Sequence, residues 1–556
     1  MTLPKSDARA ISTKGYFGRR DFLKSILAGI PAAGLDWGGF PRGQKERRAD
    51  NSYDAVIIGA GLGGLSCAAA FARQNFKPLV LEQHTAAGGY GTAFSRPGGF
   101  VFDVSLHSTS VGERAGSFNL IPGFPEIKDV EFAPLPYLYR AIFPGYDIRV
   151  PQRNPTKYAE ILTGLFPDEK ENIDGILADM RGLAGDIRKY SQAGGKANMA
   201  TFAKDYPSLV KFAGKTWGAM VDARIKDPKL KAIVSALWGY FGLPPSKLSV
   251  YYYALPTIGY LEEGGYYPRG RSQAISSALV KFIEERGGTV KLGSRVEKIM
   301  LKEHIATGVR TADGAEYSGR VVVANANPID VFTTMMDEND YLKDYLVRFQ
   351  KMSVSLSSFQ VFLGLKEDLV GKLKIPDAEV FYSPEFDDDS AYRRSLEADM
   401  GNPGFGVMLY DNVYKGYSPP GKNTINILTL QGYDHWAKFE GDYKKGQKKE
   451  YRAEKERIAD ILIKKVEEVL LPGLSRAIEV KEIGTPLTNW RYTRNTHGAI
   501  YGWDQTVDNS GPSRFPQTTP IKNLYLAGGW TQPGHGYGAV IPSGLQCFAE
   551  IMKHWS

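Results

Sequence analysis

Three glycines, Gly59, Gly61 and Gly64, have the spacing G-x-G-x-x-G that cradles the pyrophosphate of a dinucleotide. The first glycine allows a tight turn, the second lets backbone approach the phosphates, and the third lets a helix pack closely on a strand. Glu82 follows about 20 residues later, where a carboxylate accepts a hydrogen bond from a ribose 2′-hydroxyl. The pattern is weak by itself, because the chemistry also needs a strand before the turn and a helix after it.

The residues around the glycines predict those elements. Residues 55–58 form a mostly β-branched run typical of a buried strand, and residues 65–73 have a helical pattern. Residues 78–81 predict a second strand that ends at Glu82. In such a βαβ unit the helix directs its N-terminal N–H groups and the positive end of its dipole at the phosphates. FAD and NAD both fit this unit, so it predicts a dinucleotide without choosing between them.

The remaining chain predicts helices first and strands later. Residues 130–259 have a mostly helical pattern, which is clearest at residues 173–192 and 209–223. Short strands are predicted further on, with a hairpin turn at Ala-Asp-Gly, at residues 289–292, 295–301, 309–311, 316–317 and 320–324. Residues 523–553 indicate a strand, a glycine-rich turn and a closing helix that begins near Pro542.

Six segments, in order along the chain, resemble the family of phytoene desaturases, carotenoid isomerases and retinol saturases, which belongs to the wider amine-oxidase-like flavoproteins. These segments are residues 82–90, 102–107, 264–270, 321–328, 485–502 and 523–544. They include a Gly-Gly pair after the acid, a V-V-x-N-A-x-P strand and turn, and a C-terminal L-Y-x-x-G strand. The resemblance implies FAD as the cofactor.

The glycine motif and the resemblance together assign a set of residues to FAD: Gly59, Gly61, Gly64, Glu82, Gln83, Gly88, Gly89, Tyr90, Gly91, Val296, Asn325, Gly528, Gly529, Gly538 and Ala539. One position departs from the family, which usually has an acid after the L-Y-x-x-G strand to hold the ribityl chain. This chain has Gly529 there, so the contact is expected from backbone, water or another side chain. The helix that follows is expected to stabilise negative charge on the reduced flavin.

Four side chains are candidates for the chemistry, His107, His535, Trp530 and Tyr501. His107 could donate a proton to a substrate carbon or simply hydrogen-bond a loop, and His535 could pack on the flavin or act as acid or base. Trp530 could wall the substrate face or fill the gap left by the missing acid, and Tyr501 could be structural. The other histidines have no ligand-like spacing, so no metal is predicted.

The predicted fold is α/β, with a Rossmann-like (glutathione-reductase-like) FAD domain and a discontinuous, mixed α/β substrate domain. The FAD domain is expected to comprise residues 51–130, 260–330 and 480–556. The substrate domain is expected to comprise residues 131–259 and 331–479. Its aromatic stretches at 237–241 and 251–253 could line a substrate cavity or belong to the core.

The resemblance implies a redox enzyme that desaturates, saturates or isomerises carbon–carbon double bonds in a hydrophobic isoprenoid-like substrate. Such a substrate lives in membranes, which suggests peripheral membrane association. The alternatives are an amine-oxidase-like enzyme on a small substrate, an exported electron-transfer flavoprotein, and a flavin-containing binding protein without turnover. No second nucleotide motif exists, so any nicotinamide donor would have to bind transiently. Export, if the N-terminal signal is used, favours a quinone or a protein as the electron partner.

Charge and cysteine content narrow the remaining possibilities. The net charge is +8, but lysines and arginines are interspersed with acids, so no nucleic-acid partner is predicted. Cys67 and Cys547 are too few and too isolated for a zinc or iron–sulfur site. Residues 18–35 resemble a twin-arginine export signal, with an arginine pair before a short apolar run. Residues 1–50 are therefore expected to be a signal and linker, and the protein to be periplasmic or extracytoplasmic.

Overall fold

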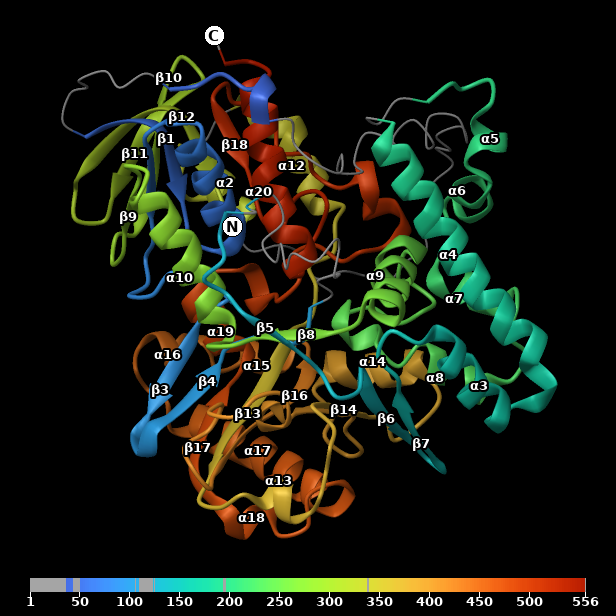
Figure 1. The fold of residues 1–556 in the computed structure, drawn as a ribbon. Helices are drawn as coiled ribbons and strands as arrows, with labels where there is room; N and C mark the ends of the chain where they lie inside the picture. Colours follow the sequence, from blue (N-terminus) through green and yellow to red (C-terminus); the bar gives the residue numbers. More distant parts are fainter. Residues whose placement is uncertain are drawn as a thin grey trace.

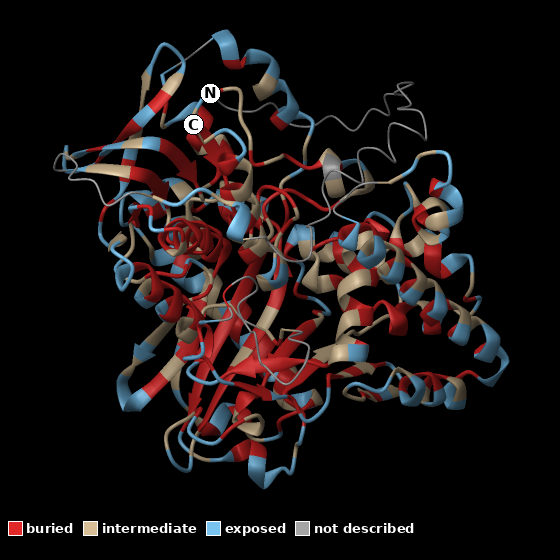
Figure 2. Cartoon of the chain, turned by 45° about the horizontal axis from the view of Figure 1, so that its top comes forward, coloured by how far each residue is buried: buried red, intermediate tan, exposed pale blue. Residues whose placement is uncertain are grey.

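The structure is a computed structural model that describes residues 37–43, 51–105, 107–109, 124, 126–193, 197–337 and 340–555. The predicted export signal at residues 18–35 lies outside the described residues. Figure 1 shows a sheet flanked by α2, α10 and α20, a group of helices beside it, and a second sheet below both. Buried residues follow the two sheets and the helices packed on them, as Figure 2 shows.

The first sheet carries the dinucleotide motif. Its five parallel strands are, in order, β9 (Thr289–Lys291), β2 (Pro78–Leu81), β1 (Ser52–Ile58), β12 (Glu316–Ala324) and β18 (Leu524–Leu526). Helices α2 (Leu62–Arg73), α10 (Arg271–Glu284) and α20 (Tyr537–Met552) pack together on one face. The strands are apolar on both faces, as parallel strands between two covering layers must be.

An antiparallel branch extends this sheet. Strands β10 (Val296–Lys302) and β11 (Ile305–Thr311) pair with each other, and β11 pairs with the first part of β12. The β11–β12 hairpin turns at Asp313-Gly314, where the Asp313 carboxylate accepts from the N–H of Ala315 at 3.3 Å and from Thr311 Oγ1 at 2.5 Å. The hairpin and the strands predicted in this region are therefore confirmed.

The second sheet is mostly antiparallel. Its order is β17 (Ile478–Gly484), β13 (Ser357–Leu365), β16 (Asn423–Gln431), β15 (Phe405–Met408), β14 (Glu379–Tyr382), β6 (Tyr139–Phe143) and β7 (Tyr146–Val150), and only β14 and β6 are parallel. The long helix α17 (Lys449–Val469) covers one face with apolar side chains. Strand β17 belongs to this sheet, so the boundary expected at residue 480 falls inside one of its strands.

Two sequence expectations in the intervening region are wrong. Residues 139–150 form the β6–β7 hairpin rather than helix, because alternating residues Tyr139, Ala141 and Phe143 are buried and Gly145 turns the chain at a φ of +78°. The helix expected at 209–223 is two short helices separated around Gly214, whose φ is +70°. The helix expected at 173–192 is present as part of α4.

The helices beside the sheets form one apolar cluster with β6 and β7. They are α3 (Pro155–Leu165), α4 (Lys170–Gln192), α5 (Phe202–Asp205), α6 (Pro207–Phe212), α7 (Trp217–Asp222), α8 (Pro228–Val234) and α9 (Val250–Glu263). Two short sheets, β3 (Ala93–Arg96) with β4 (Phe100–Asp103) and β5 (Phe132–Pro134) with β8 (Tyr266–Pro268), connect these parts.

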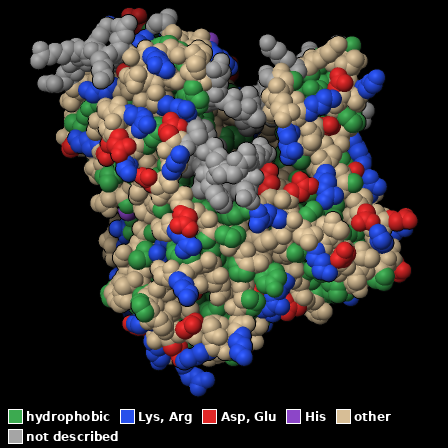
Figure 3. All heavy atoms as spheres, in the orientation of Figure 1, with side chains coloured by type: hydrophobic (Ala, Val, Ile, Leu, Met, Phe, Trp, Pro, Cys, Tyr) green, Lys and Arg blue, Asp and Glu red, His purple; other side chains and the backbone are tan. Residues whose placement is uncertain are grey.

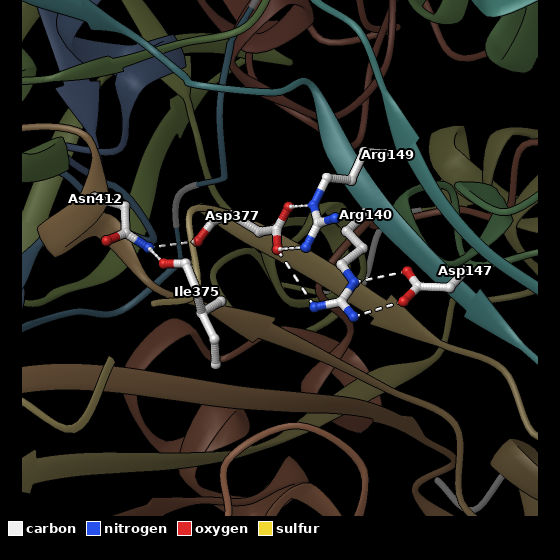
Figure 4. A network of polar contacts seen from close by, with 6 residues as sticks. All are labelled: Arg140, Asp147, Arg149, Ile375, Asp377 and Asn412. Carbon is white, nitrogen blue, oxygen red and sulfur yellow. Dashed lines mark hydrogen bonds and ion pairs between the residues drawn. The ribbon is translucent and has the colours of Figure 1, made fainter. Parts of the chain in front are cut away.

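A buried ion-pair network fixes the start of β14 (Figure 4). The Asp377 carboxylate, 1% exposed, accepts from Arg149 Nε at 2.8 Å and from Arg140 at 3.4 Å, while Arg140 also binds Asp147 at 2.6 Å. The Asn412 side-chain amide donates to the carbonyl of Asp377 at 2.7 Å. Because a buried charge is tolerated only when paired and hydrogen-bonded, these contacts hold the chain just before β14 in one place.

Candidate functional site

The glycine turn after β1 leaves no room for side chains. A Cβ on Gly59 would lie 2.6 Å from the Asn325 carbonyl oxygen, and one on Gly61 would lie 2.7 Å from Asn325 Nδ2. A Cβ on Gly64 would overlap the carbonyl oxygen of Gly59, so helix α2 sits directly on the turn. Asn325, at the end of β12, donates to the Gly59 carbonyl at 3.3 Å and closes the turn from the neighbouring strand.

Glu82 and a second glycine pair continue this surface. The buried Glu82 carboxylate accepts from the N–H of Ala60 at 2.7 Å and from the N–H of His84 at 2.8 Å. Gly88 donates to the Ala60 carbonyl at 2.7 Å, and both Gly88 and Gly89 have positive φ values. The Gly-Gly turn therefore lies on the first glycine turn, and Glu82 is fixed at the end of β2.

The C-terminal turn approaches from the other side. The N–H of Gly528, at a φ of +93°, donates to Ser543 Oγ at 3.0 Å. Helix α20 begins at Tyr537, so the start expected near Pro542 is wrong by five residues. Pro542 therefore lies inside this helix, where it removes the hydrogen bond to the carbonyl of Gly538. The N-terminus of α20 thus faces the same cavity as the N-terminus of α2.

These turns surround one large cavity of about 1140 Å³. Every predicted cofactor residue except Gly64 lines it, and Gly64 acts underneath by packing. The four catalytic candidates line it too. Two helix N-termini and three glycine turns that admit no Cβ fit an extended dinucleotide, whose phosphates and flavin ring need close backbone approach.

His535 lies beside Tyr501 in the cavity wall. Their ring centroids are 4.3 Å apart, and Phe241 lies 6.4 Å from the imidazole. Burial, with a contribution from the positive charge of Arg514, lowers the pKa of His535 well below its ordinary value. Its Nε2 is buried without a hydrogen-bond partner among the described residues. His535 is therefore a neutral imidazole with one nitrogen free to contact a ligand.

His107 has a similar state on another wall. Its ring lies 4.7 Å from that of Tyr240, and burial lowers the pKa of His107 to about 4. Its Nδ1 is also without a partner among the described residues. At neutral pH both histidines are thus uncharged, and neither adds a fixed charge to the cavity.

Trp530 and Tyr501 are held by structural contacts as well as facing the cavity. Trp530 packs edge-on against Trp503 with centroids 4.9 Å apart, and its Nε1 donates to Asn495 Oδ1 at 3.0 Å. The Tyr501 hydroxyl donates to the Gly239 carbonyl at 2.7 Å. Both side chains are therefore rigid, and the only acidic proton of Tyr501 is already engaged.

Sequence reasoning missed Arg514, which supports the departing position Gly529. The fully buried guanidinium donates to the carbonyl oxygens of Gly529 at 2.5 Å, Thr531 at 3.0 Å and Trp503 at 3.3 Å. No motif marks this arginine, since its partners are backbone groups from two loops. It places a positive charge behind the turn where the family usually has an acid.

The aromatic stretches at residues 237–241 and 251–253, called the aromatic insert below, contribute only some of their residues to the cavity. Tyr240, Phe241, Tyr251 and Tyr252 line it, whereas Tyr253 stacks in the core at 4.4 Å from Trp217. A smaller adjoining cavity of about 120 Å³ shares four lining residues with the large one, namely His107, Tyr240, Leu428 and Tyr501. The insert thus contributes a wall of tyrosines and a phenylalanine to the cavity.

The described part of the chain contains no group of three or more histidine, cysteine, aspartate or glutamate side chains placed to hold a metal ion. None of its helices combines the length and apolar character needed to cross a bilayer.

A family model for flavin containing amine oxidoreductases matches residues 62–551. The chain belongs to this family. The chloroplastic prolycopene isomerase of Arabidopsis thaliana is 27% identical over 542 residues, covering 95% of this chain and 86% of the relative. The all-trans-retinol 13,14-reductase of Danio rerio is 26% identical, covering 91% and 87%. The neurosporene-forming phytoene desaturase of Rhodobacter capsulatus is 25% identical, covering 88% and 92%.

Solved structures agree in fold. The crystal structure of an oxidoreductase from Methanosarcina mazei superposes with a TM-score of 0.59 at 16% identity, covering 90% of this chain and all of that one. The predicted α/β fold and the predicted family are confirmed. The protein is an FAD-dependent oxidoreductase, as the family resemblance of the six segments implied.

Proposed function

We propose that this flavoenzyme desaturates, saturates or isomerises carbon–carbon double bonds of a hydrophobic, isoprenoid-like polyene. The supporting observation is the aromatic wall of the cavity. Among the described residues, the carboxylates that line the cavity are Glu82, Asp330 and Glu482, and none belongs to the aromatic insert. Glu82 occupies the ribose position and Glu482 is paired with Arg96 at 2.6 Å. This wall offers a flat, mostly apolar surface to a long hydrocarbon chain, with no carboxylate in it to pair with a charged substrate. The relatives named above act on polyenes of this class.

In this proposal the protein positions the substrate, and the cofactor carries out the redox chemistry. FAD supplies hydride chemistry when bound. Tyr251, Tyr252 and Phe241 hold the chain of the substrate flat against the cavity wall and exclude water. His107 and His535 stay neutral, so they do not attract water or counter-ions into an apolar site.

An anaerobic absorbance titration of the purified holoenzyme tests the proposal. Phytoene, prolycopene and all-trans-retinol are added in detergent, with a primary diamine as the matched control. Bleaching of the oxidised flavin by phytoene supports desaturation, and reoxidation of the dithionite-reduced flavin by retinol supports saturation. Conversion of prolycopene without net oxidation, followed by chromatography, supports isomerisation. Bleaching by the diamine alone, with no polyene converted, contradicts the proposal.

We also propose peripheral binding to anionic membranes. Four basic side chains, Lys448, Arg452, Lys455 and Arg491, line the cavity, and none forms an ion pair within 4.0 Å with a described carboxylate. Elsewhere, on the face drawn in Figure 3, positive and negative side chains are interspersed. Export through residues 18–35 and a quinone or protein as electron partner complete the proposal. For membrane binding, we expect the protein to co-sediment with phosphatidylglycerol vesicles and not with phosphatidylcholine vesicles.

A further inference from the structure

A buried carboxyl group lies next to the aromatic wall of the cavity. Glu379, the first residue of β14, is 1% exposed. Its Oε1 accepts from the N–H of Ser108 at 2.7 Å and from the Tyr410 hydroxyl at 2.8 Å, and its Oε2 accepts from the Tyr240 hydroxyl at 2.9 Å. The Asp377 network two residues earlier fixes the strand that carries it.

No described lysine, arginine or histidine pairs with Glu379. Three tyrosines surround it, namely Tyr240 of the aromatic insert, Tyr410 after β15, and Tyr260 of α9. The Tyr260 hydroxyl donates to the carbonyl of Ser108 at 2.6 Å. Burial raises the pKa of Glu379, and its hydrogen bonds offset only part of that effect. Burial without a cationic partner thus shifts this carboxyl toward its protonated form.

Tyr240 connects this carboxyl to the cavity. It lines both the large cavity and the small adjoining one, and its ring lies 4.7 Å from that of His107. The preceding residue, Gly239, accepts the hydroxyl of Tyr501, which packs on His535 beside the flavin turn. Tyr410 binds the same carboxyl but lines neither cavity.

We propose that Glu379 and Tyr240 form a proton-holding site in which the carboxyl stores a proton and the tyrosine hydroxyl exchanges it with a substrate carbon. This inference rests on the proposed function. For saturation, the hydride and its two electrons come from the reduced cofactor and add to one carbon. When the carboxyl is protonated, its O–H donates to the Tyr240 oxygen, and the Tyr240 O–H turns toward the cavity. That O–H bond breaks as the second C–H bond forms, and the Glu379 proton passes to the phenolate. Water then reprotonates the carboxylate, and desaturation is the reverse.

Two matched variants test the site, Tyr240→Phe and Tyr410→Phe. Each removes one hydroxyl from the same carboxyl, but only the first removes a hydroxyl that faces the cavity. With a polyene that the wild type converts, Tyr240→Phe is expected to lower kcat at least about 100-fold with little change in KM or FAD content. Tyr410→Phe is expected to lower kcat less than about 10-fold. Equal losses in both variants, or an unchanged kcat in Tyr240→Phe, overturn the proposal.

An infrared measurement on the holoenzyme tests the stored proton without any substrate. The wild type is expected to show the carbonyl band of a protonated carboxylic acid at neutral pH, and Glu379→Gln is expected to lose it. Tyr410→Phe is expected to shift the same band by removing one donor, which secures the assignment if Glu379→Gln fails to fold. Absence of the band in the wild type overturns the proposal. Failure of every polyene in the absorbance titration instead contradicts the proposed function and leaves the infrared result to decide the proton site.

Discussion

The contact between α2 and α20 makes Gly544→Ala the sharpest test of how the cofactor site is built. A Cβ on Gly544 would overlap Ser66 Oγ and the Gly63 carbonyl oxygen. Ser66 cannot move aside easily, because its buried hydroxyl lies between two carbonyl oxygens that can accept its proton, those of Gly63 at 3.0 Å and Ile541 at 2.9 Å. The two helices must therefore separate, and the N-termini of both face the cavity.

The expected loss follows from this overlap. Overpacking a close contact costs about 1–3 kcal/mol, and an overlap that includes backbone belongs at the upper end. If the FAD-bound conformation is destabilised by about 3 kcal/mol, FAD binds roughly 100-fold more weakly. The measurement is the dissociation constant of FAD, by quenching of its fluorescence as the apoprotein is reconstituted.

A matched control separates packing from the substitution itself. Gly185 lies in α4, is exposed, and a Cβ there meets nothing within 4 Å. Gly185→Ala is expected to raise stability by up to about 1 kcal/mol through helix propensity, with FAD affinity unchanged. If Gly544→Ala binds FAD within threefold of the wild type and unfolds at the same temperature, the helix-contact reasoning is refuted.

Two further predictions concern charges near the flavin. Arg514→Met leaves three buried carbonyls without a donor and removes a buried positive charge, so we expect a lower unfolding temperature and a more negative flavin midpoint potential, measured by anaerobic dye titration; an unchanged potential contradicts this. Burial lowers the pKa of His107 to about 4, whereas the unfolded chain takes up this proton near pH 6.5. The stabilisation that the neutral His107 gives to the folded state is thus complete above about pH 6.5. As the pH falls to 4 it is lost, which lowers the free energy of unfolding by at most roughly 3 kcal/mol. Denaturant titrations should show His107→Asn with a flatter pH dependence than the wild type over that range.

Local patterns were enough to predict the dinucleotide motif. Gly59, Gly61 and Gly64 are required by contacts within a few residues or with one neighbouring strand, and β-branched runs identify that strand. The hairpin at Asp313 was equally predictable, because its turn is stabilised by its own side chain. The β6–β7 hairpin was missed since its short strands lie in a stretch that is otherwise helical.

The sequence by itself determined the dinucleotide-binding unit, through residues whose spacing and flanking strand and helix are read locally, and the family resemblance then implied FAD. Only the tertiary structure decided which polar groups share the cavity. Arg514 takes its meaning from carbonyls of other loops, and Glu379 from hydroxyls that lie 31 and 139 residues away in sequence. Such groups act through burial and through partners distant in the chain. Neither property leaves a periodic or spaced signal, and both arise only when the two sheets and the helical insert pack together.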